Sequence, residues 1–256
     1  MTPRPARAPA REGARAGAPV RLPPAVTPLL ARLGQLGDAR GVAVYGVGGC
    51  VRDWLLGRSR LTDLDVTVEG EGPAFAQAAA KAMGGTLQVH PAFGTATLQL
   101  PGRNPRRRID VAGCRKETYV RPAAYPVVAR GTLEEDLFRR DFTLNAMAVA
   151  LNAARFGALA DPFRGREDLQ RGRLRVLHAR SFLDDPTRIL RGIRFAQRFG
   201  WAFEAQTARR LREALAAGAL GWLNAGRLER ELTRLLQEPD PAACLRHLSR
   251  LLERAR

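Results

Sequence analysis

The segment from Val44 to Gly70, VYGVGGCVRDWLLGRSRLTDLDVTVEG, constrains the fold of this chain more than any other stretch. A strand-like apolar run ends at the glycine pair Gly48 and Gly49, a short helical pattern follows and closes at Gly57, and LDVTVEG alternates as a second strand. Strands on both sides of a short helix indicate a sheet with helices packed on it. We therefore expect a fold of the α+β class.

The rest of the chain divides into parts with different patterns. Residues 1–24 mix Pro, Arg, Ala and Gly without a hydrophobic period and read as a basic disordered tail. Up to about residue 115, helical patterns alternate with the strand-like runs TLQVH, TATLQL and RIDVAG. The pattern then turns helical, first in TLEEDLFRRDFTLNAMAVAL and again after the loop DPFRGREDLQRGRLR. We therefore expect a small mixed sheet with helices over 25–165 and a helical domain over 166–256. The helices expected in that second part cover residues 186–199, 205–217, 226–237 and 242–256.

The charge of the chain points to a polyanionic partner. Its 42 Lys and Arg residues outnumber its 25 Asp and Glu residues, which gives a formal net charge of +17. A surplus of this size attracts polyanions, and nucleic acid is the leading class. A GC-rich genome would leave the same bias, because Lys81 and Lys116 are the only lysines and Ala and Gly abound. Both explanations stay open.

Several classes of protein are disfavoured by the sequence. No apolar run approaches the ~20 residues that a membrane helix needs, and the N-terminus lacks the apolar core of a secretory signal. We therefore expect a cytoplasmic protein with no membrane association, and no protein partner is evident. The cysteines form no Cys-x-x-Cys pair and should be reduced, and the histidines should be packing or surface residues. These residues are Cys50, Cys114, Cys244, His90, His178 and His247.

Two aspartates stand one residue apart at the start of the second strand. Side chains two positions apart on a strand point to the same side, so Asp63 and Asp65 should project together. Paired carboxylates repel unless a cation lies between them, and Mg²⁺ takes oxygen ligands that it commonly shares with substrate phosphates. The pattern is typical of a phosphoryl- or nucleotidyl-transfer site. A solvated turn before a strand would use the same residues, because aspartate is common in turns.

The glycine pair and a later aspartate could complete such a site. Gly48 and Gly49 precede a helix whose first turn carries Arg52, so backbone N–H groups and a guanidinium can converge on a polyphosphate. A glycine pair is also found in ordinary turns. Asp110 could supply a third carboxylate from a strand beside the acid pair. Alternatively, Asp110 could be an edge-strand acid that balances the arginines at 106–108.

Three segments carry a resemblance to a known family. GVGGCVRDWLLGRSRLTDLDVTVEG resembles the signature of the tRNA nucleotidyltransferase/poly(A) polymerase family, class II type, and EEDLFRRDFTLNAMA resembles its second motif. DDPTRILRGIRFAQRFGWAFEAQT resembles the neck segment that selects the incoming nucleotide. The resemblance covers about residues 40–238. It implies a polymerase-beta-like nucleotidyltransferase head followed by an all-helical neck. The implied reaction adds C and A from CTP and ATP to the 3′ end of tRNA without a template, with Mg²⁺ as cofactor and pyrophosphate as product.

The resemblance implies roles for individual residues in the head. Asp63 and Asp65 would hold the metal, and Gly49 and Arg52 would contact the triphosphate. The residues that match the motif for the nucleotide's sugar and phosphates are Arg139, Arg140, Asp141 and Asn145. A helix with adjacent arginines and an aspartate could equally be a salt-bridged surface.

In the neck, the resemblance implies that Asp185 and Arg188 select the base. A carboxylate can accept from the exocyclic amine of cytosine or adenine while an arginine donates to the neighbouring ring acceptor. Asp185 before Pro186 could instead be an ordinary helix cap. Arg191 and Arg194 would lie nearer the phosphates or hold the pocket's shape, because arginines three apart drift around a helix and should not all touch one ligand.

The resemblance leaves the product open. Members of the family add CCA, only CC, only the final A, or poly(A) tails. The segment from Tyr119 to Arg130 resembles the flexible loop that CC-only enzymes shorten, and its retention favours an enzyme able to add A. We expect the helical part to be truncated relative to the family, which continues into domains that hold tRNA. The competing interpretations are a non-catalytic RNA-binding paralogue and nucleotidyl transfer to a small molecule or protein.

Overall fold

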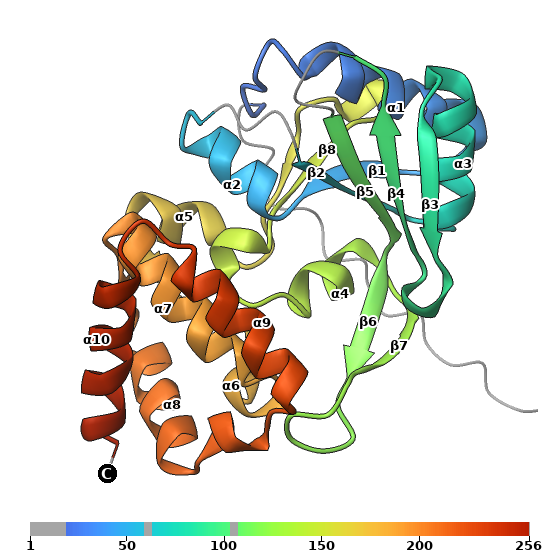
Figure 1. Ribbon diagram of the computed structural model, residues 1–256. Coiled ribbons are helices and arrows are strands. Elements are labelled where there is room, and N and C mark those ends of the chain that lie inside the picture. The colour runs from blue at the N-terminus through green and yellow to red at the C-terminus, as the bar shows by residue number, and fades with distance from the viewer. Residues whose placement is uncertain (1–18, 59–62, 103–106, 256) are drawn as a thin grey trace, which may run out of the picture.

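A seven-stranded sheet and a bundle of helices make up the molecule, and the α+β expectation is confirmed (Figure 1). The computed structural model describes residues 19–58, 63–102 and 107–255, so most of the predicted tail over 1–24 lies outside these ranges. None of the described helices is long and apolar enough to cross a membrane. The strands, in sheet order, are β3 (Thr86–His90), β4 (Thr95–Leu100), β5 (Arg107–Gly113), β2 (Asp63–Val68), β1 (Val44–Val47), β8 (Ala148–Ala150) and β9 (Leu159–Ala160).

Side-chain alternation gives the sheet two different faces. One face packs against α1 (Thr27–Arg40) and α3 (Gly72–Met83), and it buries the apolar residues of β2, β4 and β5. In β2 these are Leu64, Val66 and Val68, while Asp63 and Asp65 point to the opposite face. The apolar half of the strand pattern therefore fixes the direction in which the acidic half points.

The expectation that TLEEDLFRRDFTLNAMAVAL is helical throughout is wrong. Only α4 (Leu133–Phe138) is an α-helix, and the segment then passes through a short 3₁₀ turn into β8. β8 pairs with β1 on one side and β9 on the other, and its three residues are buried. A short apolar run cannot distinguish a buried strand from a helix by periodicity alone, so tertiary pairing decides here. The predicted loop after it also contains a helix, α5 (Gly165–Gln170).

The C-terminal helices surround a second core. The expected helices are present as α7 (Thr187–Phe199), α8 (Ala205–Ala216), α9 (Ala225–Leu236) and α10 (Pro241–Glu253), preceded by the short α6 (Ser181–Asp184). Phe142 and Leu144, from the segment before β8, are fully buried in this second core, whereas Leu169 of α5 joins the first. Each core therefore contains residues from both sides of position 165. The division into two domains at residue 165 stays a prediction.

A hairpin bridges the main sheet and the C-terminal helices. It lies on the side of the sheet to which Asp63 and Asp65 point. It consists of β6 (Arg115–Thr118) and β7 (Val127–Arg130), which pair antiparallel outside the main sheet. Figure 1 shows the hairpin extending from the sheet towards the C-terminal helices. Its tip contacts them, because the Ala123 amide donates to the Leu183 carbonyl at 3.1 Å.

Candidate active site

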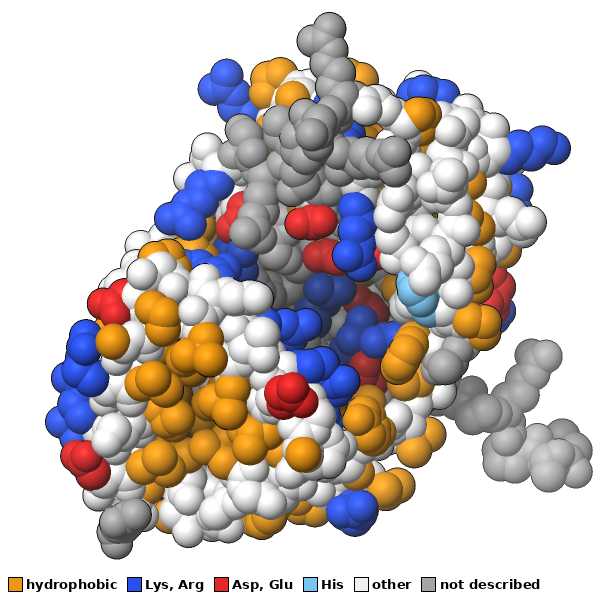
Figure 2. All heavy atoms as spheres, in the orientation of Figure 1, with side chains coloured by type: hydrophobic (Ala, Val, Ile, Leu, Met, Phe, Trp, Pro, Cys, Tyr) orange, Lys and Arg blue, Asp and Glu red, His pale blue; other side chains and the backbone are white. Residues whose placement is uncertain are grey.

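A cleft of about 390 Å³ opens between the acid-bearing side of the sheet and the C-terminal helices. Its walls come from α2 (Gly49–Leu55), β2, β6, the segment after α4, and α7. Figure 2 shows the hollow near the middle of the visible face, with acidic and basic side chains gathered in it. The sequence-predicted residues that line it are Gly48, Gly49, Arg52, Asp65, Arg139, Arg140, Asp141, Asn145, Asp185, Arg188 and Arg191.

The acid pair lies where two parallel strands meet. β2 and β5 are the parallel pair of the main sheet, and their register places Asp65 directly beside Asp110. Asp63 is exposed at the first residue of β2, on the same side of the strand as Asp65. The structure therefore brings the three predicted carboxylates onto one face of two neighbouring strands.

Asp110 also makes the pairing that the alternative interpretation expected. Its carboxylate forms a 3.0 Å ion pair with Arg108 and accepts a 2.7 Å hydrogen bond from the Thr97 hydroxyl. The Thr97 hydroxyl is in turn 3.2 Å from Nε2 of His90. β5 is an interior strand, so the edge-strand part of that interpretation is wrong. Asp110 lies beside Asp65 and is held in place by neighbours on β4 and β5.

The surroundings of Asp65 favour a positive ligand. More than a third of the residue is accessible to solvent, yet desolvation by the surrounding protein raises the pKa of its carboxyl group. Arg140 opposes that rise, while the nearby charges of Asp110 and Asp63 add to it. A cation placed between these neighbouring carboxylates would stabilise their negative charges.

The donor set fits a magnesium ion. Within the part of the chain that the structure describes, no three or more His, Cys, Asp or Glu side chains are arranged as a complete metal cluster. Asp63 and Asp65 instead offer two carboxylates from one strand, next to an open cleft. Mg²⁺ commonly binds through one or two carboxylates and completes its shell with water and phosphate oxygens.

The glycine turn lets an arginine lie close to the backbone. Gly48 has φ +73°, and a Cβ built there would lie 2.6 Å from Nη1 of Arg140. The Gly48 amide donates to the Met147 carbonyl at 3.2 Å, so this N–H is already used. The buried Nε of Arg140 has no acceptor among the described residues. Arg140 also lines the cleft, so its guanidinium group can contact a phosphate oxygen there.

A chain of polar contacts runs from the glycine turn to the helices. Arg52, which is 5% exposed, bonds Asp53 at 2.9 Å and the side-chain oxygen of Asn145 at 2.8 Å. The Asn145 amide donates to Asp141 at 2.9 Å, and Asp141 accepts from Arg191 of α7. The network fixes the side chains on both walls of the cleft relative to one another.

Asp141 is kept ionised by this network. Burial alone would raise the pKa of its carboxyl group. The charge of Arg191 and the hydrogen bonds from Asn145, Arg191 and the Phe142 amide outweigh burial and lower the pKa to about 2. In return, Asp141 raises the pKa of Arg191. Both groups are charged at neutral pH, so Arg191 faces the cleft as a fixed cation.

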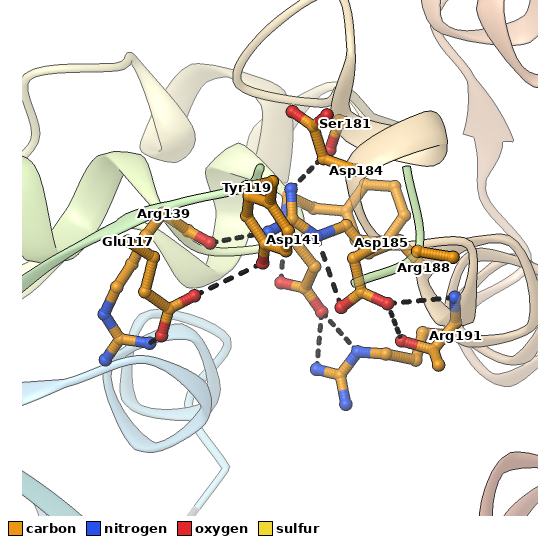
Figure 3. A network of polar contacts seen from close by, with 12 residues as sticks. Glu117, Tyr119, Arg139, Asp141, Ser181, Asp184, Asp185, Arg188 and Arg191 are labelled. Carbon is orange, nitrogen blue, oxygen red and sulfur yellow. Dashed lines mark hydrogen bonds and ion pairs between the residues drawn. The ribbon is translucent and has the colours of Figure 1, made fainter. Parts of the chain in front are cut away.

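The predicted base-selecting pair also lines the cleft and lies near Asp141 and Arg191 (Figure 3). Arg188 is 3% exposed, and its guanidinium donates to the Ser181 hydroxyl and to the Arg139 carbonyl, both at 2.7 Å. Its Nε lies 3.8 Å from Oδ2 of Asp185. Asp185 also accepts from the amide and hydroxyl of Thr187, at 3.0 and 2.5 Å. It therefore makes the helix-start contacts of the alternative interpretation while it lines the cleft.

Arg194 is the predicted arginine that the structure does not bring into the cleft. Its guanidinium is paired with Glu238 at 2.9 Å and with Glu231 at 3.4 Å. The cleft is lined by Arg188 and Arg191 from the same helix. The drift of arginines around α7 explains the separation. Arg194 instead joins α7 by ion pairs to Glu231 of α9 and to Glu238, which follows α9.

A second cavity of about 490 Å³ shares a wall with the cleft. Asp65, Arg139 and Arg140 line both spaces, and Asp110, Thr97 and His90 line only the second. Phe93 also belongs to its lining and is 68% exposed. The two spaces meet at Asp65.

Comparison with known protein families shows to which family the chain belongs. The family model described as the poly A polymerase head domain matches residues 44–175, just over half of the chain. The chain belongs to this family. The head-domain match runs from the start of β1 to just past β10 (Arg173–Leu174), so it includes the acid pair and the Arg139–Asn145 segment. The neck residues Asp185 and Arg188 lie beyond it.

Curated relatives of this head-domain protein extend the similarity into the neck. The A-adding tRNA nucleotidyltransferase of Geobacter sulfurreducens is 43% identical over 90% of this chain and 26% of its own length. The enzyme of the same name from Halalkalibacterium halodurans is 40% identical over 87% of this chain and 52% of its own. A solved apo structure of a CCA-adding enzyme is 44% identical, with a TM-score of 0.84, over 90% of this chain and 54% of its own. The chain thus spans between about a quarter and about half of the length of these proteins.

Several residues that line or contact the cleft were not predicted from the sequence as site residues. Glu117 and Tyr119 of the hairpin line the cleft, and Glu117 accepts from Arg139 at 3.1 Å. His178 lies 3.4 Å from Arg188, so the expectation of a packing or surface role missed a contact with the site. RKETYV carries no motif around Glu117, and a lone histidine gives no signal of its own. Glu117 is held at the cleft by its contact with Arg139, 22 residues along the chain.

Proposed function

We propose that the protein is a template-independent RNA nucleotidyltransferase that adds A, or C and A, to the 3′ end of tRNA with release of pyrophosphate. One observation carries this proposal above the others. Asp65 of β2 and the Asp185/Arg188 pair line the same cleft, so a carboxylate suited to a metal and a pair suited to a base share one space. The names of the relatives, A-adding tRNA nucleotidyltransferases, support the choice of tRNA.

In this proposal, Asp185 and Arg188 recognise the base of ATP or CTP. Oδ1 of Asp185 is occupied by Thr187 and Arg227, whereas Oδ2 has, among the described residues, only the 3.8 Å contact with Arg188. Oδ2 can therefore accept from the exocyclic amine that adenine and cytosine share. Arg188 donates to the adjacent ring nitrogen. Uracil and guanine present the opposite pattern at these positions, and they would leave a buried charge without a partner.

The triphosphate would lie along the other arginines that line the cleft. Arg52, Arg140 and Arg191 are each held by a carboxylate. Asp63 and Asp65 would hold Mg²⁺, which when bound activates the attacking hydroxyl and neutralises charge on the leaving pyrophosphate. The protein contributes position and fixed charge, since its arginines are in place before the nucleotide arrives.

The second cavity suits the RNA end. It meets the nucleotide cleft at Asp65, so a 3′-hydroxyl in it would face the α-phosphate of a nucleotide in the first. The exposed ring of Phe93 offers a stacking surface, and the Arg108 and Arg115 side chains offer phosphate contacts. Asp110, the third carboxylate, would lie on the side of the RNA. Because the substrate is tRNA, we place the protein in the cytoplasm.

A addition is the form of the reaction that we favour. The two relatives described above are named A-adding, and the hairpin that resembles the flexible loop of A-competent enzymes is present. Full CCA addition is the second candidate, because the similar solved structure is a CCA-adding enzyme. The two differ in the RNA ends that they accept.

The test supplies purified protein and Mg²⁺ with three tRNAs, ending before CCA, after C and after CC, and with CTP or ATP separately. Product length and pyrophosphate release are both measured. An A-adding enzyme extends only the CC end and only with ATP, whereas a CCA-adding enzyme also extends the shorter ends with CTP. Long A ladders would indicate poly(A) synthesis. RNA binding without extension on any end would overturn the proposal in favour of a non-catalytic RNA-binding protein.

A further inference from the structure

One buried arginine outside the cleft lining contacts both the base-selecting pair and the hairpin. Arg227 lies in the first turns of α9 and is 8% exposed. Its Nη2 donates to Oδ1 of Asp185 at 2.7 Å, and its Nη1 donates to the Ala123 carbonyl at 2.7 Å. The guanidinium also lies 5.4 Å from the centre of the Tyr125 ring. No sequence motif drew attention to it.

The contact with Asp185 determines which carboxylate oxygen is available. Oδ1 accepts from Arg227 and from the amide and hydroxyl of Thr187, which together fill its acceptor positions. The carboxylate cannot rotate without losing these bonds. Oδ2 is therefore left beside Arg188, on the side of the cleft (Figure 3).

The contact with the hairpin holds a conformation that the chain does not favour. Ala123 has φ +55°, in the left-handed region that alanine rarely adopts. Its carbonyl is held by Arg227 and its amide by the Leu183 carbonyl, while the Tyr125 hydroxyl accepts from Asn224 at 3.3 Å. The hairpin tip is thus fastened to α9 and to the residues just before Asp185.

We propose that Arg227 is a positioning residue that sets nucleotide selectivity by fixing the orientation of Asp185 and tying it to the hairpin tip. The proposal rests on the nucleotidyl-transfer function proposed above. Arg227 needs two separate N–H groups pointing in different directions, one for a carboxylate and one for a carbonyl. Lysine carries a single ammonium on a flexible stem and cannot reproduce this fork.

The experiment compares wild type with R227A and R227K. We measure kcat/KM for ATP and GTP on a tRNA that the wild type extends, and the affinity of the RNA-free protein for labelled ATP in competition with unlabelled GTP. R227A should lower the ATP-to-GTP preference about 10- to 100-fold, the range expected when a charge-assisted hydrogen bond is lost. R227K should recover part of the preference. The control R209A removes an exposed arginine that is paired with Glu213 and should leave the preference unchanged.

A double variant separates positioning from general destabilisation. If Arg227 acts through Asp185, R227A should have no further effect on preference in a D185A background. A preference in R227A within twofold of wild type, or an equal loss in both backgrounds, would overturn the inference. A wild type that binds ATP selectively but extends no RNA would contradict the proposed function alone, since the binding measurement still reports on Arg227. If R227A does not fold, R227K carries the same test.

Discussion

At the scale of single residues, three arginines of the cleft are each paired with a carboxylate. Arg52 is paired with Asp53, Arg140 with Asp136 and Arg191 with Asp141. These pairs hold the guanidinium groups at fixed positions before any ligand binds. A site that does not need to reorganise stabilises charge in a transition state better than water does.

Asp65 gives the most direct prediction at this scale. Asp65→Asn keeps the shape of the side chain and removes its negative charge, so we expect nucleotide incorporation to fall about 100-fold or more. The measurement is extension of a tRNA that the wild type accepts, with circular dichroism to show that the fold is retained. Retained incorporation in a folded variant would contradict the assignment.

Asp240→Asn is the matched control for that substitution. Asp240 is exposed at the start of α10, where its side chain accepts from the Ala243 amide at 2.8 Å. Asparagine is an equally good helix cap. The same chemical change, made away from the cleft, should leave incorporation unchanged.

The protonation of His178, which lies beside Arg188, makes the stability of the fold depend on pH. Burial, and then the charge of Arg188, lower the pKa of its imidazole to about 4, although the nearby Asp184 opposes the shift. The unfolded chain would bind a proton near pH 6.5. The neutral form in the folded state therefore contributes stability above about pH 6.5, and that contribution is lost as pH falls towards 4. We expect Tm to fall less over this range in His178→Gln than in wild type, and identical pH profiles would contradict the assignment.

At the scale of helices and strands, alternation and glycine positions predict most of the first half of the fold. The strands of the acid pair and of Asp110 are where the sequence predicts them, because their apolar residues alternate over several positions. β8 escapes prediction because its three residues are buried on both faces and lie between two partner strands. Short buried strands depend on neighbours that the local sequence does not reveal.

At the site too, local patterns could be predicted from the sequence and long-range contacts could not. Asp63, Asp65, Gly48 and Arg52 form one local stretch and could be proposed together from the sequence. Asp65 lies beside Asp110 because two strands that are distant in the sequence pair in parallel. The sequence alone could not decide whether these two aspartates are neighbours. Arg227 lies outside every motif, and its contacts with Asp185 and Ala123 come from packing alone.

The docking of α1 gives a prediction about stability. A Cβ on Gly34 would lie 1.7 Å from the Leu151 carbonyl oxygen, and backbone cannot move aside easily. Gly34→Ala should therefore lower the free energy of unfolding by about 3 kcal/mol or more. Gly221→Ala is the control, because nothing lies within 4 Å of a Cβ at that position. Its effect should stay below about 0.5 kcal/mol, and urea denaturation measures both.

At the scale of the whole molecule, the charge of +17 makes RNA binding sensitive to salt. Each phosphate that is neutralised releases counterions, so affinity should fall about tenfold or more between about 50 and 200 mM salt. Fluorescence anisotropy of a labelled tRNA measures this. A nearly flat salt dependence would favour the alternative that the arginines reflect genome composition.

The position of Phe142 has a consequence for how this protein can be divided. The residue belongs to the segment between α4 and β8, yet its ring lies among Phe182, Phe195 and Phe203 of the C-terminal helices. A fragment that ends at residue 165 would expose this ring to water, and a fragment that begins at 166 would lack the group that fills its interior. We therefore expect that expression of either half alone gives insoluble or partly structured material.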